Sequence, residues 1–205
     1  MKYFAHLFCL CFFTSHVAHA QTYTALKAGG ALSGFKYNFE NNIQARITWY
    51  GGISANFDVE DQFFIRTEFL YSLRGYHVPA SANFNKGNIS YSYLSLPLLA
   101  GYKPLEKLSV MVGPEPGYML KAKSKDEINN TDITHLVKYR FSVDANAGLS
   151  WEFTPELLIE THFVVGLTPL YNVLYTDGQG NITGNGRDGF HRLLQLGLVY
   201  KMSGH

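Results

Sequence analysis

Two neighbouring side chains in the sequence combine a base with an acid. Glu160 and His162 lie two residues apart in the segment ELLIETHFVVGLT, so a strand would place them on one face. A histidine of this kind can activate a serine hydroxyl when the two groups lie within hydrogen-bond distance. One hypothesis is therefore a lipid-modifying hydrolase that uses His162 with Glu160, and its candidate nucleophiles are Ser72, Ser142 and Ser150. Because His162 falls near the centre of its segment, we favour a role in a packed polar interior.

Charged side chains of both signs follow the same face of the predicted strands. A buried ion without a partner is costly, so a near balance of signs predicts ion pairing inside the protein. We expect an interior polar plug and no open channel, since side chains fill the interior of a small barrel. A path for protons or ions is the alternative. The expected members of the plug are Arg66, Glu68, Arg74, Glu115, Lys138, Arg140, Asp144, Glu152, Glu160 and His162, with Arg46 and Lys121 on the same phase.

The segment VKYRFSVDANAGLSWEF, residues 137–153, alternates between apolar and polar side chains along its whole length. Successive side chains of a strand point to opposite faces, so the pattern predicts one long strand with an apolar face and a polar face. Most of the predicted strands have about 12 residues or more, roughly twice the average for globular proteins. The alternation recurs, with varying clarity, in seven further segments: 22–36, 46–57, 62–76, 89–102, 108–121, 157–168 and 190–202.

The connections between these strands are alternately short and long. This is typical of an up-and-down barrel whose short turns lie in the periplasm and whose long loops lie outside. Pro114 and Pro116 lack the amide donor that a closed sheet uses, so we expect an interrupted hydrogen-bond ladder there. The short connections are 58–61, 103–106 and 154–155, and the long polar ones are 38–44, 77–88, 122–135 and 170–189.

The apolar face of these strands is too large and too uniform to fill the interior of an eight-stranded barrel. The polar face contains several glycines. It has few of the paired Lys and Glu residues that are typical of a strand face exposed to water. An apolar band between two rings of aromatic side chains is typical of a barrel in a bilayer. The aromatic residues expected in these lipid-facing girdles are Trp49, Phe57, Phe63, Tyr102, Tyr118, Trp151, Phe153 and Tyr200.

These patterns predict an all-β protein, an eight-stranded antiparallel up-and-down transmembrane β-barrel in contact with outer-membrane lipid and monomeric. The reverse orientation would give a soluble, lipocalin-like barrel that binds a ligand inside. A formal net charge of +1 indicates no nucleic-acid partner. No cofactor or metal is expected, since the Asp177-Gly178 loop would place Tyr175 and Gly186 at calcium-ligand positions.

Residues 1–20 have the features of a signal peptide, and residues 21–205 would then form the barrel domain. Lys2 precedes an apolar run over residues 3–13, and Ala18-His19-Ala20 fits a cleavage site. Both cysteines, Cys9 and Cys11, lie in this segment, so the exported chain would contain no thiol for a disulfide or a metal.

Several short motifs resemble the small outer-membrane β-barrel domain of Bacteroidota that is called the PorT family. They are Tyr93-Leu94, Pro97-Leu98-Leu99 with Tyr102, Gly113-Pro114, Gly117-Tyr118, the strand with Glu68, Tyr71, Ser72 and Gly75, and the pair Asp144 and Gly148. The resemblance covers nearly all of the chain after residue 20. It implies a non-enzymatic outer-membrane barrel with long extracellular loops and an envelope, secretion-accessory or interaction role, since the founding member is linked to type IX secretion. Ser95, where the family usually has an acidic residue, and a C-terminus without an aromatic residue depart from the pattern.

Overall fold

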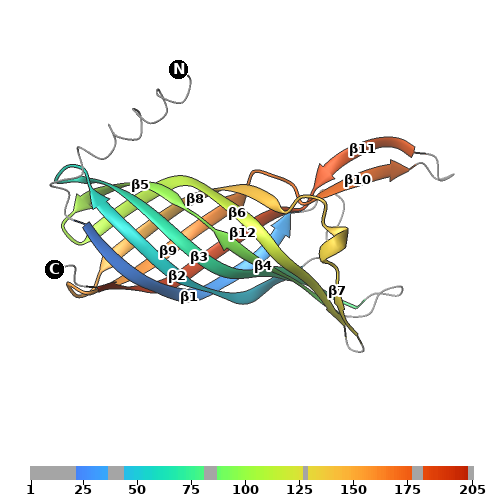
Figure 1. Cartoon of the computed structure of the whole chain (residues 1–205), viewed down its shortest axis with the longest axis horizontal. Coiled ribbons are helices and arrows are strands. Elements are labelled where there is room, and N and C mark those ends of the chain that lie inside the picture. Colours follow the sequence, from blue (N-terminus) through green and yellow to red (C-terminus); the bar gives the residue numbers. More distant parts are fainter. Residues whose placement is uncertain (1–21, 37–43, 81–86, 127–128, 177–181, 203–205) are drawn as a thin grey trace, which may run out of the picture.

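The computed structural model describes residues 22–36, 44–80, 87–126, 129–176 and 182–202, and places them in one closed β-barrel with extensions at one end (Figure 1). The predicted signal peptide, residues 1–20, lies outside these residues. The strands of the barrel are β1 (Thr22–Lys36), β2 (Gln44–Asp58), β3 (Phe63–Val78), β4 (Gly87–Ser95), β5 (Leu98–Leu105), β6 (Leu108–Asp126), β8 (Phe141–Glu152), β9 (Leu157–Gly166) and β12 (Phe190–Met202).

All neighbouring strands of the barrel are antiparallel. Their order is β2, β1, β12, β9, β8, β6, then β4 with β5, then β3, and pairing of β3 with β2 closes the sheet. The strands β4 and β5 occupy one position, since both lie between β3 and β6. Within the described residues the barrel therefore has eight strand positions, and the predicted eight-stranded up-and-down barrel is confirmed.

The two ends of the barrel differ in construction. Thr24 pairs with Met202, so the first and last described strands meet at the end that contains the short turns. At the opposite end, β6 extends outward and pairs with β7 (Asn130–Asp132), and the short 3-10 helix η1 (Thr134–Leu136) follows. We call these the turn end and the loop end. No helix in the described part of the chain is long and apolar enough to span a membrane.

The loop end also contains a separate two-stranded sheet, where the sequence predicts an irregular polar loop over residues 170–189. The strands β10 (Tyr171–Thr176) and β11 (Ile182–Asp188) form an antiparallel hairpin that projects beyond the barrel (Figure 1). The sequence YNVLYT at β10 is rich in residues that favour strands, which the polar composition of the whole connection obscures.

Most large apolar side chains of the barrel strands point outward, whereas the buried charges point inward together with a smaller set of apolar side chains such as Leu70 and Val164. Along β12, Leu194 and Leu196 are 52% and 62% exposed, whereas Gln195 between them is 2% exposed. The same alternation runs along β3 and β8. A soluble lipocalin-like barrel requires the opposite orientation, so that alternative is wrong.

The ladder is interrupted next to the two prolines of β6. Between β4 and β5, Leu96 and Pro97 leave the regular pairing, and the Leu96 amide donates to the Pro116 carbonyl at 2.8 Å. The nitrogens of Pro114 and Pro116 face this same side, because the amide and carbonyl of a strand residue point the same way. On the other side, Pro114 and Pro116 stay in register with Ala145 and Val143. The missing donors therefore lie where the neighbouring strand itself has a break.

Candidate functional site

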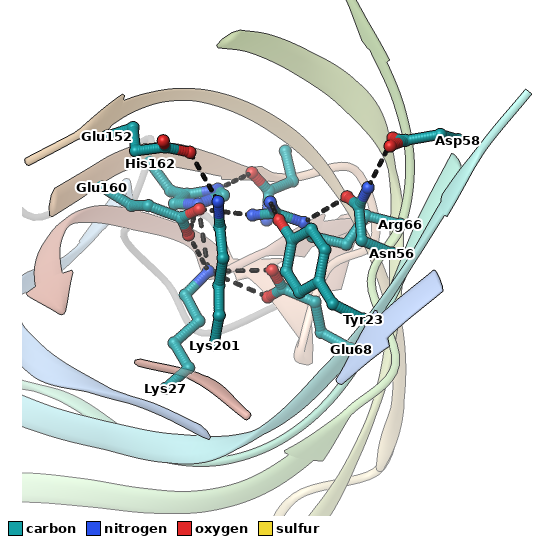
Figure 2. A network of polar contacts seen from close by, with 11 residues as sticks. Tyr23, Lys27, Asn56, Asp58, Arg66, Glu68, Glu152, Glu160, His162 and Lys201 are labelled. Carbon is teal, nitrogen blue, oxygen red and sulfur yellow. Dashed lines mark hydrogen bonds and ion pairs between the residues drawn. The ribbon is translucent and has the colours of Figure 1, made fainter. Parts of the chain in front are cut away.

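A buried cluster of charges occupies the barrel interior nearer the turn end (Figure 2). At its centre the Lys27 ammonium lies 2.9 Å from Glu68 Oε1 and 3.1 Å from Glu160 Oε2. Arg66 pairs with the other oxygen of Glu160. His162 Nε2 completes the surroundings of the ammonium at 3.0 Å. We call Lys27, Arg66, Glu68, Glu160 and His162 the turn-side cluster; it sets two cations against two carboxylates.

Hydrogen bonds also fix the orientation of the Arg66 guanidinium. Its Nε donates to Asn56 Oδ1 at 3.2 Å, and one terminal nitrogen donates to the Tyr23 hydroxyl at 2.8 Å. Asn56 in turn donates to Asp58 at the turn end. Arg66 is therefore held from three strands, which leaves its side chain a single orientation.

His162 is held by both of its ring nitrogens. Nδ1 lies 2.9 Å from Asn146 Oδ1, and Nε2 lies 3.0 Å from the Lys27 ammonium and 3.3 Å from Glu160 Oε2. With the proton on Nδ1, the ring donates to Asn146 Oδ1 and Nε2 accepts from the Lys27 ammonium, which also lies between Nε2 and Glu160 Oε2. His162 is thus a fixed member of the network.

A second cluster lies nearer the loop end and is built around Arg74. The guanidinium donates to Asp144 Oδ2 at 2.6 Å and to Glu115 Oε1 at 2.7 Å, and it lies 4.5 Å from the centre of the Tyr93 ring. We call Arg74, Glu115 and Asp144 the loop-side cluster. It sets one cation against two carboxylates, and Asp144 Oδ1 has no hydrogen-bond partner among the described residues.

Asn146 joins the two clusters. Its amide nitrogen donates to Glu115 Oε2 at 2.8 Å, and its amide oxygen faces His162 Nδ1. Since all of these side chains are buried, the polar contacts continue from Arg66 to Arg74 through the middle of the barrel.

A layer of aromatic and apolar side chains covers the loop-side cluster toward the loop end. Tyr91 and Tyr93 are fully buried, His191 Nε2 lies 3.0 Å from the Tyr93 hydroxyl, and the Phe35 ring lies 4.5 Å from the His191 ring. The hydroxyl groups of Tyr91 and Tyr171 form a hydrogen bond with each other. Burial raises the pKa of the Tyr171 phenol to about 12. At neutral pH the Tyr171 hydroxyl therefore keeps its proton. We call this layer the aromatic cap: Phe35, Tyr76, Tyr91, Tyr93, Met119, Val137, Leu170, Tyr171 and His191.

Three residues expected in the plug lie outside it. Lys138 and Arg140 are exposed, because β8 begins only at Phe141 and Val137 turns inward into the aromatic cap. Lys121 is exposed because β6 has an irregularity beside it: Ser92 pairs with Lys121, but Tyr93 pairs with Met119. One extra residue in a strand reverses the facing of every residue beyond it.

Two further predicted members lie at the edges of the interior. Glu152 forms a half-exposed ion pair with Lys201, at 2.5 Å, at the turn end (Figure 2). Arg46 is half-buried toward the loop end and donates to Ser90 Oγ at 2.6 Å. The remaining predicted members, Arg66, Glu68, Arg74, Glu115, Asp144, Glu160 and His162, are buried in the two clusters.

The aromatic residues expected in the girdles point away from the interior. Phe63 and Tyr102 contact each other on the outer surface at the turn end, with ring centres 5.1 Å apart. Trp49 lies 5.5 Å from the ring of Tyr71 on the same surface. Phe57 is half-buried; the residues with large exposed fractions are Trp49, Phe63, Tyr102, Tyr118, Trp151, Phe153 and Tyr200.

The structure does not assemble a hydrolase site at His162. Ser72 Oγ accepts from Arg74, and the hydroxyls of Ser142 and Ser150 have no hydrogen-bond partner among the described residues. His162 is 1% exposed, so a substrate has no access to its ring. A serine nucleophile needs its base within hydrogen-bond distance, and no described serine meets that condition.

A metal is also a poor fit to the turn-side cluster. Oxygen and nitrogen atoms of Glu68, Glu160 and His162 lie close enough together to bind one ion. The Lys27 ammonium, however, lies within 3.1 Å of all three side chains. A cation is already present where a metal would bind.

Sequence reasoning missed Lys27, although it is central to the network. A signal was present: Leu26 and Leu32 of β1 are outward-facing residues, so the alternation predicts that Lys27 faces inward. Asn146 was counted as polar without a role, because its two bonds depend on partners from β6 and β9.

The family model described as "Outer membrane protein beta-barrel domain" matches residues 19–172. Among solved structures, the chain is similar to Ail, the attachment invasion locus protein of Yersinia pestis, in its complex with the heparin analogue sucrose octasulfate. The identity is 14%, the TM-score 0.53, and the match covers 88% of this chain and 99% of Ail. It is also similar to Neisserial surface protein A, with 11% identity, a TM-score of 0.54, and coverage of 88% and 97%. At such identities the likeness shows the fold alone. No curated protein matches the sequence.

Proposed function

This chain belongs to the family of outer-membrane β-barrel domains, and from that premise we propose that it is a non-enzymatic barrel with a closed interior and an interaction surface outside. The protein lies in the outer membrane, with its apolar outer face in contact with lipid. The turn end faces the periplasm and the loop end faces the outside, as in other bacterial barrels of this construction.

One observation carries the proposal: the polar contacts run continuously through the interior and end below the aromatic cap. Within the described residues, both clusters are buried and are joined through Asn146. Ions pass a barrel through a hydrated lumen, and an eight-stranded interior filled by side chains leaves no such lumen. The barrel therefore acts as a rigid anchor.

The interaction surface that we propose is built from the extensions at the loop end. The outer part of β6 with β7, and the β10–β11 hairpin, extend beyond the barrel as hydrogen-bonded strands (Figure 1). The edges of such strands present backbone hydrogen-bonding groups to which a partner can add a strand. The partner class that we propose is another envelope protein. The resemblance to the PorT family, with its link to type IX secretion, makes a secretion-system component the first choice.

Conductance in planar lipid bilayers tests the closed interior. We expect no steady current from the wild-type barrel. A stable, ohmic conductance would contradict the proposal, because it requires a water-filled path through the clusters.

Incubation with lipid A tests the absence of enzymatic activity. We expect no product from either the wild-type protein or His162→Ala. A product that forms with the wild type and disappears in His162→Ala would overturn the non-enzymatic function and restore the hydrolase hypothesis.

The interaction surface has its own test. Site-specific crosslinking from Asn130 in β7 in intact cells should trap one envelope protein, whereas crosslinking from Glu106 at the turn end should not trap it. Equal trapping from both positions would contradict a partner that binds at the loop end.

We also propose that residues 1–20 are a cleaved signal peptide. The N-terminus of protein purified from outer membranes should then be Gln21. An N-terminus at Met1 would contradict this proposal and leave the barrel unaffected.

A further inference from the structure

The two ends of the barrel carry exposed charges of opposite sign. At the loop end, the exposed cations of the described residues are Lys36, Lys121, Lys123, Lys125, Lys138, Arg140 and Arg192. Among the residues whose side chains the structure describes, the acids there are Asp126 and Asp132, of which Asp132 pairs with Lys121. At the turn end, described acidic residues outnumber the basic ones. The acids are Asp58, Glu60, Asp61, Glu106, Glu152 and Glu156, and the bases are Lys103, Lys107 and Lys201. The outer surface is therefore basic on the side that meets the outer leaflet.

Arg192 differs from the other cations because it lies on the lipid-facing side of a barrel strand. It occupies the outward phase of β12, in line with Leu194, Leu196, Leu198 and Tyr200. Eight residues separate it from Tyr200; at ~3.3 Å per residue and a tilt of ~40°, this spans about 20 Å across the membrane. The apolar band of such barrels is about 25 Å tall, so Arg192 lies near the outer edge of the hydrocarbon region.

The Arg192 guanidinium has neither an ion pair nor a hydrogen bond with any residue that the structure describes. Its register partners are Gly34 of β1, which has no side chain, and Val165 of β9. Lys36 lies two residues beyond Gly34 on the same face of β1 and is exposed as well. Arg192 and Lys36 therefore lie on neighbouring strands, two residues apart in register, at the outer edge of the apolar surface.

A depression of about 250 Å³ lies next to Arg192 and Gly34, and Lys36 lies two residues along β1 from Gly34. Gly34 and Ala45 leave the space open, and Leu32, Phe163 and Leu194 form its apolar walls. Arg192 borders the same depression. The surface thus combines a cationic rim with an apolar floor, which fits a molecule that has an anionic headgroup and an acyl chain.

We propose that this depression binds a phosphorylated glycolipid of the lipid A type from the outer leaflet. Arg192 and Lys36 contact the phosphate, since a guanidinium donates two parallel hydrogen bonds to phosphate oxygens. An acyl chain lies over Leu32, Phe163 and Leu194 in the space above Gly34. Free inorganic phosphate shares the first contact only, and the test below separates the two sources.

The charge arm of the test uses the full-length mature barrel in phosphatidylcholine nanodiscs that contain bis-phosphorylated lipid A. Native mass spectrometry counts the lipid A molecules that stay bound after transfer to detergent. We expect Arg192→Gln to weaken retention about tenfold, as the loss of a charge-assisted hydrogen bond would. Dephosphorylated lipid A should be retained as poorly by the wild type. Lys107→Gln, an exposed cation at the turn end, is the matched control and should retain lipid A like the wild type.

A second set of variants keeps both cations and fills the depression with a larger side chain. A Cβ at Gly34 would meet only Ala45, at 3.6 Å, so Gly34→Leu fits the backbone while its side chain occupies the depression. Gly30→Leu lies on the same face, outside the depression, with its nearest contact at 3.8 Å. We expect Gly34→Leu to lose retention and Gly30→Leu to keep it.

Three outcomes would overturn the proposal. They are unchanged retention in Arg192→Gln, equal retention of lipid A and dephosphorylated lipid A, and full displacement of lipid A by millimolar inorganic phosphate. Circular dichroism of each variant checks the fold. Arg192, Lys107 and Gly30 are exposed, and Gly34 is half-buried on the same outer surface.

Discussion

The two ionic clusters inside the barrel differ in their balance of charge. In the turn-side cluster two cations face two carboxylates, and each ion contacts at least one ion of opposite sign. In the loop-side cluster Arg74 alone faces two carboxylates, and Asp144 Oδ1 has no described partner. Equally buried charges are therefore not equally required for stability. Loss of any ion unbalances the turn-side cluster, whereas loss of one carboxylate leaves the loop-side cluster balanced.

The largest effect expected is that of Lys27→Met. Its ammonium separates Glu68 from Glu160, and methionine has a similar length without the charge. Loss of one member of a buried pair costs about 3–5 kcal/mol, because the remaining charges stay buried and uncompensated. Urea unfolding in phospholipid vesicles measures the change in the free energy of unfolding. Lys107→Met, on the exposed turn end, should unfold like the wild type.

Glu160→Gln should have a smaller but still large effect. The substitution leaves Lys27 and Arg66 with Glu68 as their only carboxylate, while the amide oxygen of glutamine can still accept one hydrogen bond. We expect a loss of about 3 kcal/mol in the same unfolding measurement. An unchanged stability would show that the turn-side cluster does not depend on its charge balance.

Asn146→Leu separates the two clusters without changing any charge. It removes the acceptor opposite His162 Nδ1 and the donor to Glu115 Oε2, and both groups stay buried. The expected loss is about 2 kcal/mol, the cost of leaving buried polar groups unpaired. NMR of the imidazole nitrogens should report a changed environment for His162. An unaltered His162 spectrum would contradict the bridge.

The smallest effect is expected for Asp144→Asn. The amide oxygen keeps the contact with Arg74, and the loop-side cluster becomes balanced, with one cation and one carboxylate. Stability should stay within about 1 kcal/mol of the wild type. A loss as large as that of Glu160→Gln would mean that the two clusters respond alike, and the comparison would fail.

The strands could be predicted from the sequence because a barrel strand has a simple period. The predicted segments 22–36 and 190–202 coincide with β1 and β12, and most others differ by a few residues at their ends. The predicted single strand over 89–102 is wrong, because a break at Leu96 and Pro97 divides it into β4 and β5. The prediction fails where a local irregularity intervenes. The extra residue beside Lys121 and the late start of β8 at Phe141 moved three charges from the interior to the surface.

The candidate site was only partly predictable. Alternation identifies which side chains face inward, so the buried carboxylates and arginines were found. The alternation does not indicate which inward-facing residues contact each other. Lys27 of β1 contacts Glu68 of β3 and Glu160 of β9, and these contacts depend on the stagger of the strands around the barrel. The hairpin of β10 and β11 does not follow from the polar composition of its connection, because its strands pair with each other outside the barrel sheet.

The orientation of the strands follows from the amino-acid pattern alone. With a period of two, one face of each strand is apolar enough to contact lipid, and the other face contains the charges that must be buried inside. The partners of each charge depend on the folded barrel, because cross-strand register and barrel closure bring together members of the turn-side cluster up to 135 positions apart, such as Lys27 and His162. The same closure left Arg192 unpaired beside Gly34, at the edge of the membrane.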